Sequence, residues 1–233
     1  MSAYGQFCPV AKAAEVFAER WTPLLVRELL CGSHHFTQLL QGLPRMSQSL
    51  LVQRLKSLER AGIVERRPVR TGRGWEYHLT EAGVEFAQVV ERLGEWGQRW
   101  AVDRLGPEDL DAGLLMWSMH RDVDVTRIPE RRVVMQFDFR GLPKERYWHI
   151  LKRPDVEVCL KDYGFEVDLF VVADLMALTK VHLGRLEMLH ATKEGFIELE
   201  GPLPLRRAFP RWIGVNHFAR YGRPLPPAGT VSR

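Results

Sequence analysis

The sequence lacks the features that mark several common protein classes. Its three cysteines, Cys8, Cys31 and Cys159, are widely spaced and include no CxxC pair, which argues against a disulfide framework or a zinc module. No apolar run approaches the roughly 20 residues of a membrane-spanning helix. The first residues show neither the basic cluster nor the apolar segment of a signal peptide. We therefore expect a cytoplasmic protein that does not contact a membrane.

Motifs for catalysis and cofactor binding are missing too. The sequence contains no GxSxG, P-loop or GxGxxG motif. None of its eight histidines pairs with a carboxylate or cysteine at metal-ligand spacing. The expectation is a protein that is not an enzyme and that needs no metal and no cofactor.

Positive charge is concentrated in one stretch of the chain. The formal net charge is only +4, but eight basic residues lie between positions 45 and 73, opposed by Glu59 and Glu65 alone. A local excess of this kind either binds a polyanion or forms an ordinary solvated surface.

Helical spacing predicts three helices before this stretch, over residues 8–20, 22–30 and 36–40. Ser47 is a good N-cap for a fourth helix that ends at Ala61-Gly62 and buries Leu51, Leu55 and Leu58.

Two extended segments, 63–69 and 75–79, follow and flank a glycine-containing turn, which predicts a β-hairpin. Thr80 then caps a long helix, 81–105. The order of elements predicts a winged helix-turn-helix with flanking helices.

A helix that enters the major groove presents short polar and basic side chains opposite its apolar side. On the fourth helix the candidate DNA contacts are Ser47, Gln48, Ser49, Val52, Gln53, Arg54, Lys56 and Arg60. At the hairpin tip, Arg70 and Arg73 are candidates for the minor groove or the backbone. The alternative is that helix and hairpin form an ordinary protein interface.

A dense set of motifs runs along residues 7–100. They are Cys8-Pro9, Arg20-Trp21, His35-Phe36, Met46-Ser47, Gly62-Ile63, and Tyr77-His78-Leu79-Thr80 with Gly83. This set resembles the HxlR family of bacterial transcriptional regulators, although His35 replaces the arginine usual there. The resemblance implies a homodimer that binds a palindromic operator in double-stranded DNA.

A row of apolar residues in the last predicted helix of this half bears on assembly. Phe86, Leu93 and Trp100 repeat every seven residues, with Val89 and Trp96 between them. This row either forms a short coiled-coil-like dimer seam or packs against the protein's own C-terminal domain.

Cys8 precedes a predicted helix, where the helix dipole favours a thiolate. In some relatives of HxlR type the cysteine at this position senses oxidants or electrophiles. Here Cys8 is either such a redox sensor or a small capping residue.

The pattern changes after Gly106-Pro107, which predicts domains at 1–106 and 107–223 and a disordered tail at 224–233. Alternation predicts a strand over 132–139 with Val133, Met135, Phe137 and Phe139 on one face. Further strands are predicted near 156–161, 166–172 and 196–200, and helices near 173–183 and 205–212. The mixture without regular βαβ alternation indicates an α+β fold.

Within residues 173–212, Gly184-Arg185-Leu186 and Glu200-Gly201 match the later half of sterol-carrier-protein-like domains. The segment is similar to that family, which implies a five-stranded sheet with helices on one side and an apolar tunnel. Candidate pocket residues are Trp117, Phe170, Met176, Leu178, Leu183, Met188, Phe209 and Trp212. The same residues also suit a plain core.

The leading hypothesis is a homodimeric DNA-binding transcriptional regulator that an apolar small molecule or lipid modulates through its C-terminal domain. One alternative is a redox-sensing regulator that uses Cys8 and has a purely structural C-terminal domain. Another is a lipid carrier that uses the N-terminal domain only for dimerisation.

Overall fold

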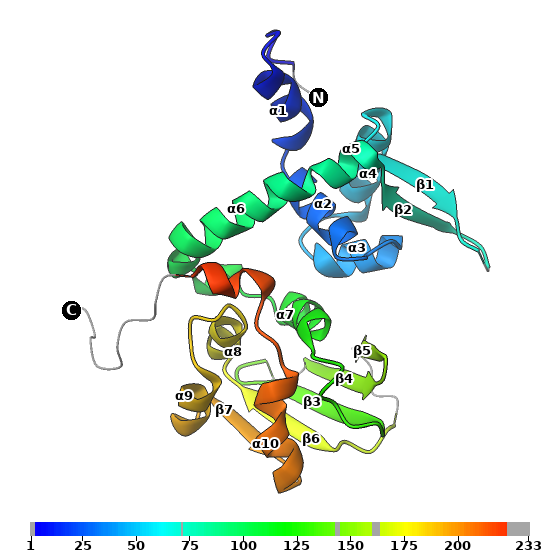
Figure 1. Cartoon of the computed structure of the whole chain (residues 1–233). Helices are drawn as coiled ribbons and strands as arrows, with labels where there is room; N and C mark the ends of the chain where they lie inside the picture. Colours follow the sequence, from blue (N-terminus) through cyan, green and yellow to red (C-terminus); the bar gives the residue numbers. More distant parts are fainter. Residues whose placement is uncertain (1–2, 71, 143–144, 160–163, 223–233) are drawn as a thin grey trace. The chain divides into compact units, whose positions relative to one another are not determined.

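The computed structural model describes residues 3–70, 72–142, 145–159 and 164–222 (Figure 1). The chain divides into two compact units, Met1–Gly94 and Glu95–Arg233, and the division falls inside helix α6. The predicted tail at 224–233 lies outside the described residues. No helix in the described ranges is long and apolar enough to cross a membrane.

The first unit opens with three helices. Their bounds are Pro9–Phe17 for α1, Thr22–Leu30 for α2 and Phe36–Gly42 for α3. Pro9 and Pro23 stand in the first turns of α1 and α2, where the missing N–H of proline costs nothing. The predicted helix over 22–30 is therefore confirmed, whereas the first helix ends three residues before the predicted Arg20.

Helix α4, Gln48–Arg60, is the fourth predicted helix. The Oγ of Ser47 caps it by accepting a hydrogen bond from the Leu50 N–H at 3.3 Å. Strands β1, Val64–Pro68, and β2, Trp75–Leu79, then pair antiparallel as the predicted hairpin.

The predicted continuous helix over 81–105 is wrong in its length. Helix α5 spans Glu81–Glu85, α6 spans Ala87–Trp100, and a short 3₁₀ turn follows at Val102–Arg104. The interruption lies at Phe86, whose ring stacks on Phe17 with centroids 4.6 Å apart. A contact with α1 therefore accompanies the break.

The core of the first unit contains a buried carboxylate. Glu28 is 1% exposed, and it accepts hydrogen bonds from Arg27 at 2.8 Å and Ser33 at 3.2 Å. A side chain at Gly42 would collide with this carboxylate, because a Cβ there would lie 2.0 Å from it. Glycine at the end of α3 thus lets α2 and α3 pack closely around a satisfied charge.

The second unit contains the five-stranded sheet that was expected. Its order is β5-β4-β3-β6-β7, and β3 pairs parallel with β6 while the other neighbours are antiparallel. The strands are Val133–Phe139, Arg146–Lys152, Asp155–Cys159, Leu169–Ala173 and Ile197–Glu200 for β3 to β7.

Helices α7, α8, α9 and α10 accompany this sheet (Figure 1). They span Ala112–Met119, Leu175–His182, Met188–Lys193 and Leu203–Trp212. The main core joins them to the face of β3 that carries Val133, Met135, Phe137 and Phe139, as predicted from the alternation. A smaller cluster on the other face contains Val134, Trp148, Ile150 and Cys159.

Strand β4 was not predicted. Its five central residues are all buried, because Tyr147 and Leu151 belong to the main core while Trp148 and Ile150 belong to the smaller cluster. A strand covered on both faces lacks polar alternation, the signal on which the prediction of strands depends.

Candidate nucleic-acid interface

Helix α4 presents one apolar and one polar side. Leu51, Leu55 and Leu58 are at most 2% exposed and form part of the core of the first unit. The opposite side is exposed and carries most of the predicted contacts: Ser47, Gln48, Ser49, Val52, Gln53, Lys56 and Arg60. The fold therefore fixes the helix by its leucines and leaves its polar side accessible to a ligand.

This exposed side combines two kinds of chemistry. Ser49 and Gln53 offer hydrogen-bonding groups that suit base edges, and Val52, 39% exposed, offers an apolar surface that suits a thymine methyl group. Lys56 and Arg60 add positive charge farther along the helix, and Arg60 also hydrogen bonds back to the Lys56 carbonyl at 3.3 Å. The arrangement suits a groove lined by phosphates.

Arg54 departs from the predicted arrangement. Its guanidinium forms an ion pair with Glu19, in the segment between α1 and α2, and its side chain is only 20% exposed. Arg54 therefore joins α4 to the preceding helices, and we do not retain it among the proposed DNA contacts.

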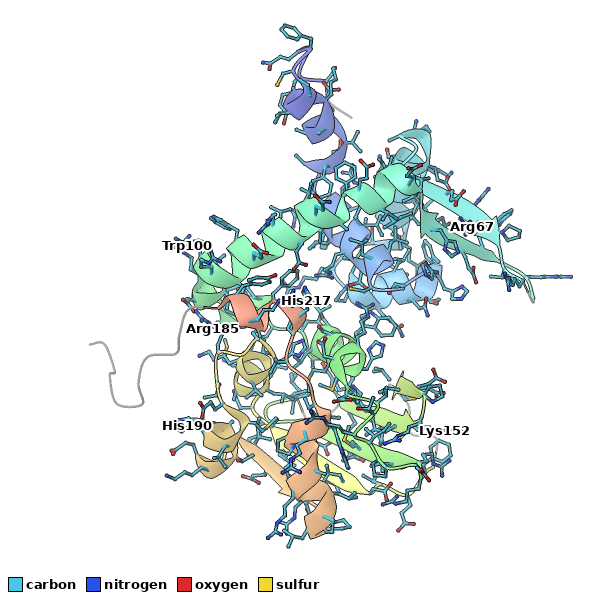
Figure 2. All side chains as sticks on the ribbon, viewed as in Figure 1. Arg67, Trp100, Lys152, Arg185, His190 and His217 are labelled. Carbon is cyan, nitrogen blue, oxygen red and sulfur yellow. The ribbon has the colours of Figure 1, made fainter. Side chains whose placement is uncertain are left out.

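The hairpin carries exposed arginines at its tip and along β1. Arg70 and Arg73 lie in the turn between the two strands and are exposed. Arg66 lies over the Trp75 ring at 4.2 Å. Arg67, on β1 and labelled in Figure 2, pairs with Glu65. Arg66 and Arg67 belong to the basic stretch of the sequence, but they were not predicted as DNA contacts. Their positions in the first predicted strand of the hairpin could have identified them.

Thr80 and Gly83 fix the base of the hairpin. The Thr80 hydroxyl donates to the Gly62 carbonyl at 2.6 Å and accepts from the Gly83 N–H at 3.2 Å. A Cβ at Gly83 would lie 2.2 Å from the Ile63 carbonyl oxygen, so only glycine allows α5 to sit this close to the start of β1. The three-residue spacing of Thr80 and Gly83 is therefore explained by the cap at the start of α5 and by its close packing against Ile63.

A cluster of three histidines and a glutamate joins the start of α3 to β2, and sequence reasoning missed it. His34 and His78 stack with ring centroids 4.3 Å apart, and the Nδ1 of His34 lies 3.0 Å from the Tyr77 carbonyl. Glu76 lies 3.0 Å from His78 and 3.7 Å from His35. The hydrogen bond from His78 is the main cause that lowers the pKa of Glu76. These contacts hold the hairpin against the helices.

The candidate pocket residues of the second unit do not form one group. Leu178, Phe209 and Trp212 lie in the main core, and Met188 packs against it. Phe170 alternates along β6 with the core residues Leu169 and Val171, so it belongs to the opposite face of the sheet.

The other three candidate pocket residues, Trp117, Met176 and Leu183, are partly exposed. Among the described residues no cluster of histidine, cysteine, aspartate or glutamate is arranged to hold a metal ion.

Cys8 lies where the sequence placed it, as the N-cap residue of α1, and it is a partly exposed free thiol. Its carbonyl accepts the first hydrogen bond of the helix, from the Lys12 N–H at 3.0 Å.

Comparison with known proteins assigns the first half of the chain. The model of the HxlR-like helix-turn-helix family matches residues 16–104. The transcriptional regulator YvaP of Bacillus subtilis is 36% identical over 101 residues, which cover 41% of this chain and 90% of YvaP. The regulator YodB of the same organism is 31% identical over 99 residues, which cover 40% of this chain and 85% of YodB.

Solved structures of YodB include reduced, diamide-treated and quinone-bound forms. The reduced form is 30% identical and covers 41% of this chain and 96% of its own, with a TM-score of 0.37. The second unit lies largely outside all of these matches. With a polar helix face beside a basic hairpin, and with YvaP and YodB as sequence relatives, the chain belongs to the HxlR-like helix-turn-helix family of transcriptional regulators.

Proposed function

We propose that this regulator binds a palindromic operator as a homodimer, with α4 in the major groove and the hairpin against the adjacent backbone or minor groove. The observation that carries the proposal is the exposed polar side of α4, which stands opposite three fully packed leucines. Exposed Arg70 and Arg73 at the hairpin tip supply positive charge where a wing meets DNA.

The apolar surface of α6 supports the dimer. Val89, Leu93, Trp96 and Trp100 are 42%, 49%, 62% and 50% exposed, and they recur along one helix at heptad-like spacing (Figure 2 labels Trp100). Exposed apolar rows of this kind mark interaction surfaces. We propose that two copies of α6 pair along this row.

The replacement Gln53→Ala tests the role of α4. We expect the preference for operator over unrelated DNA to fall by about 1–3 kcal/mol, because a side chain that reads a base edge is lost. Lys56→Ala should instead weaken binding to all sequences alike and reduce the salt dependence by about one phosphate contact. Fluorescence anisotropy with a duplex selected from genomic fragments measures both quantities.

Gln41→Ala is the matched control, because it removes the same amide from an exposed position on α3 of the same unit. The proposal predicts that this control keeps the preference for the operator. If Gln53→Ala and Gln41→Ala leave that preference equally intact, α4 is not the reading helix.

We propose further that the second unit is a sterol-carrier-like domain that receives the regulatory signal, an apolar small molecule or lipid. The five-stranded sheet with helices packed on β3 and the partly exposed Trp117, Met176 and Leu183 support this reading. Linkage then requires effector and operator to change each other's affinity by the same factor.

The second candidate for the signal is oxidation of Cys8. It is favoured by the partly exposed thiol at the start of α1 and by the reduced, diamide-treated and quinone-bound forms of the relative YodB.

One experiment separates the two signals. We expect native mass spectrometry of protein from its host to show a bound apolar molecule, whose removal changes the operator dissociation constant at fixed salt. Diamide should leave that constant unchanged in the wild type and in Cys8→Ser. A diamide effect that Cys8→Ser abolishes, in protein with no bound molecule, would replace the ligand proposal by the redox one.

A further inference from the structure

Helix α10 of the second unit has a strongly basic outer face. Leu205, Phe209 and Trp212 bury its inner side in the main core, each at most 8% exposed. Arg206, Arg207 and Arg211 are all exposed on the other side, and the helix contains no acidic residue. Arg207 and Arg211 are one helical turn apart, so they project in similar directions.

These three arginines differ from the other arginines that lie between positions 121 and 220. Between positions 121 and 220 of the described chain, the other arginines contact a carboxylate, a carbonyl oxygen or a ring, as do Arg121, Arg127, Arg131, Arg132, Arg140, Arg146, Arg153, Arg185 and Arg220. Within the described ranges, Arg206, Arg207 and Arg211 make no ion pair, side-chain hydrogen bond or ring contact. Their charges are therefore available to an external anion.

The geometry favours a polyanion over a lipid surface. A helix that lies on a membrane inserts its apolar side between the lipids. The apolar side of α10 is already committed to the core, and of its large apolar residues only Leu203, 48% exposed, remains accessible. A row of guanidinium groups without an insertable apolar side matches phosphates along a nucleic-acid strand.

We propose that the outer face of α10 binds the phosphate backbone of double-stranded DNA as a second, sequence-independent contact of this chain. The proposal rests on the proposed function, since the first unit is what brings DNA to the protein. Once α4 and the hairpin hold a duplex, the second unit is covalently linked to a DNA-bound unit, so a weak contact with the same duplex becomes intramolecular.

The test compares full-length wild type with the triple variant Arg206→Ala, Arg207→Ala, Arg211→Ala. Binding to operator and to unrelated duplex is measured over a series of salt concentrations. Each lost phosphate contact reduces the slope of log K against log salt by about 0.9, so the expected change is up to about 2.7 per chain. The affinity should fall by the same factor on both duplexes, because the backbone is the same in both.

The matched control removes three arginines of the same unit that already have carboxylate partners, Arg131→Ala, Arg140→Ala and Arg146→Ala. It changes the net charge equally, and we expect it to retain the wild-type slope. A second variant, Arg206→Lys, Arg207→Lys, Arg211→Lys, should retain most of the wild-type slope, which separates lost charge from lost folding.

Three outcomes would overturn the proposal. The first is a wild-type slope in the α10 alanine variant, and the second is an equal change in the control. The third is that the α10 alanine variant loses the binding of wild type to vesicles containing phosphatidylserine while its DNA binding is unchanged. None of these depends on Gln53, so a failure here is distinguishable from a failure of α4 as the reading helix.

Discussion

Asp122 is a carboxylate that the second unit holds partly away from water. Its side chain is 24% exposed, and its Oδ2 lies 3.7 Å from the Nε2 of His182. Burial raises the pKa of Asp122 to about 6, although Arg121 and His217 act in the opposite direction. Burial also lowers the pKa of His182 to about 4, so this ring is neutral near pH 7 and gives Asp122 no compensating charge.

The replacement Asp122→Asn is therefore expected to stabilise the protein above pH 6. The folded protein retains the Asp122 proton between about pH 4 and pH 6, where the unfolded chain releases it, so this group makes stability fall as pH rises through that interval. The amide avoids the cost of ionisation, and the gain near neutral pH should be on the order of 1–2 kcal/mol.

Urea unfolding of both proteins at about pH 4 and about pH 8 measures this difference. His149 is buried with a lowered pKa and has the opposite pH dependence, but both proteins contain it, so its contribution to the free energy of unfolding cancels in the comparison. A gain of the same size at both pH values would show that ionisation of Asp122 is not its cause.

Elements whose signals are local were predictable from the sequence. Ser47 as the cap of α4, the three buried leucines and the glycine-containing turn of the hairpin each depend on residues only a few positions apart. The candidate DNA-binding surface was predictable for the same reason, because the spacing of the leucines along α4 predicts which side of the helix is buried and which is exposed.

Elements that depend on tertiary contacts were not predictable in this way. Strand β4 is covered on both faces and shows no alternation. The break between α5 and α6 accompanies the stacking of Phe86 on Phe17. The pairing of Arg54 with Glu19 joins α4 to the segment between α1 and α2. Helical spacing records which side of α4 Arg54 lies on, but it does not record the carboxylate that the fold brings beside it.

The whole molecule is proposed to act as a dimer, and this requires a surface that excludes water between two copies. Leu93 lies in the middle of the exposed row on α6 and is 49% exposed. In a twofold dimer the same row of each copy is buried, so one charged residue at this position places two unpaired carboxylates in the seam.

Leu93→Asp is expected to give a folded monomer whose affinity for the operator falls by more than tenfold, because the two recognition helices are no longer held together across half-sites about 34 Å apart. Light scattering coupled to size-exclusion chromatography measures the mass, and anisotropy measures the affinity. Leu189→Asp is the matched control, since Leu189 is a more exposed leucine, 77% accessible, on α9 of the second unit. A dimer that survives Leu93→Asp but dissociates with Leu189→Asp would show that the interface lies at α9 and not at α6.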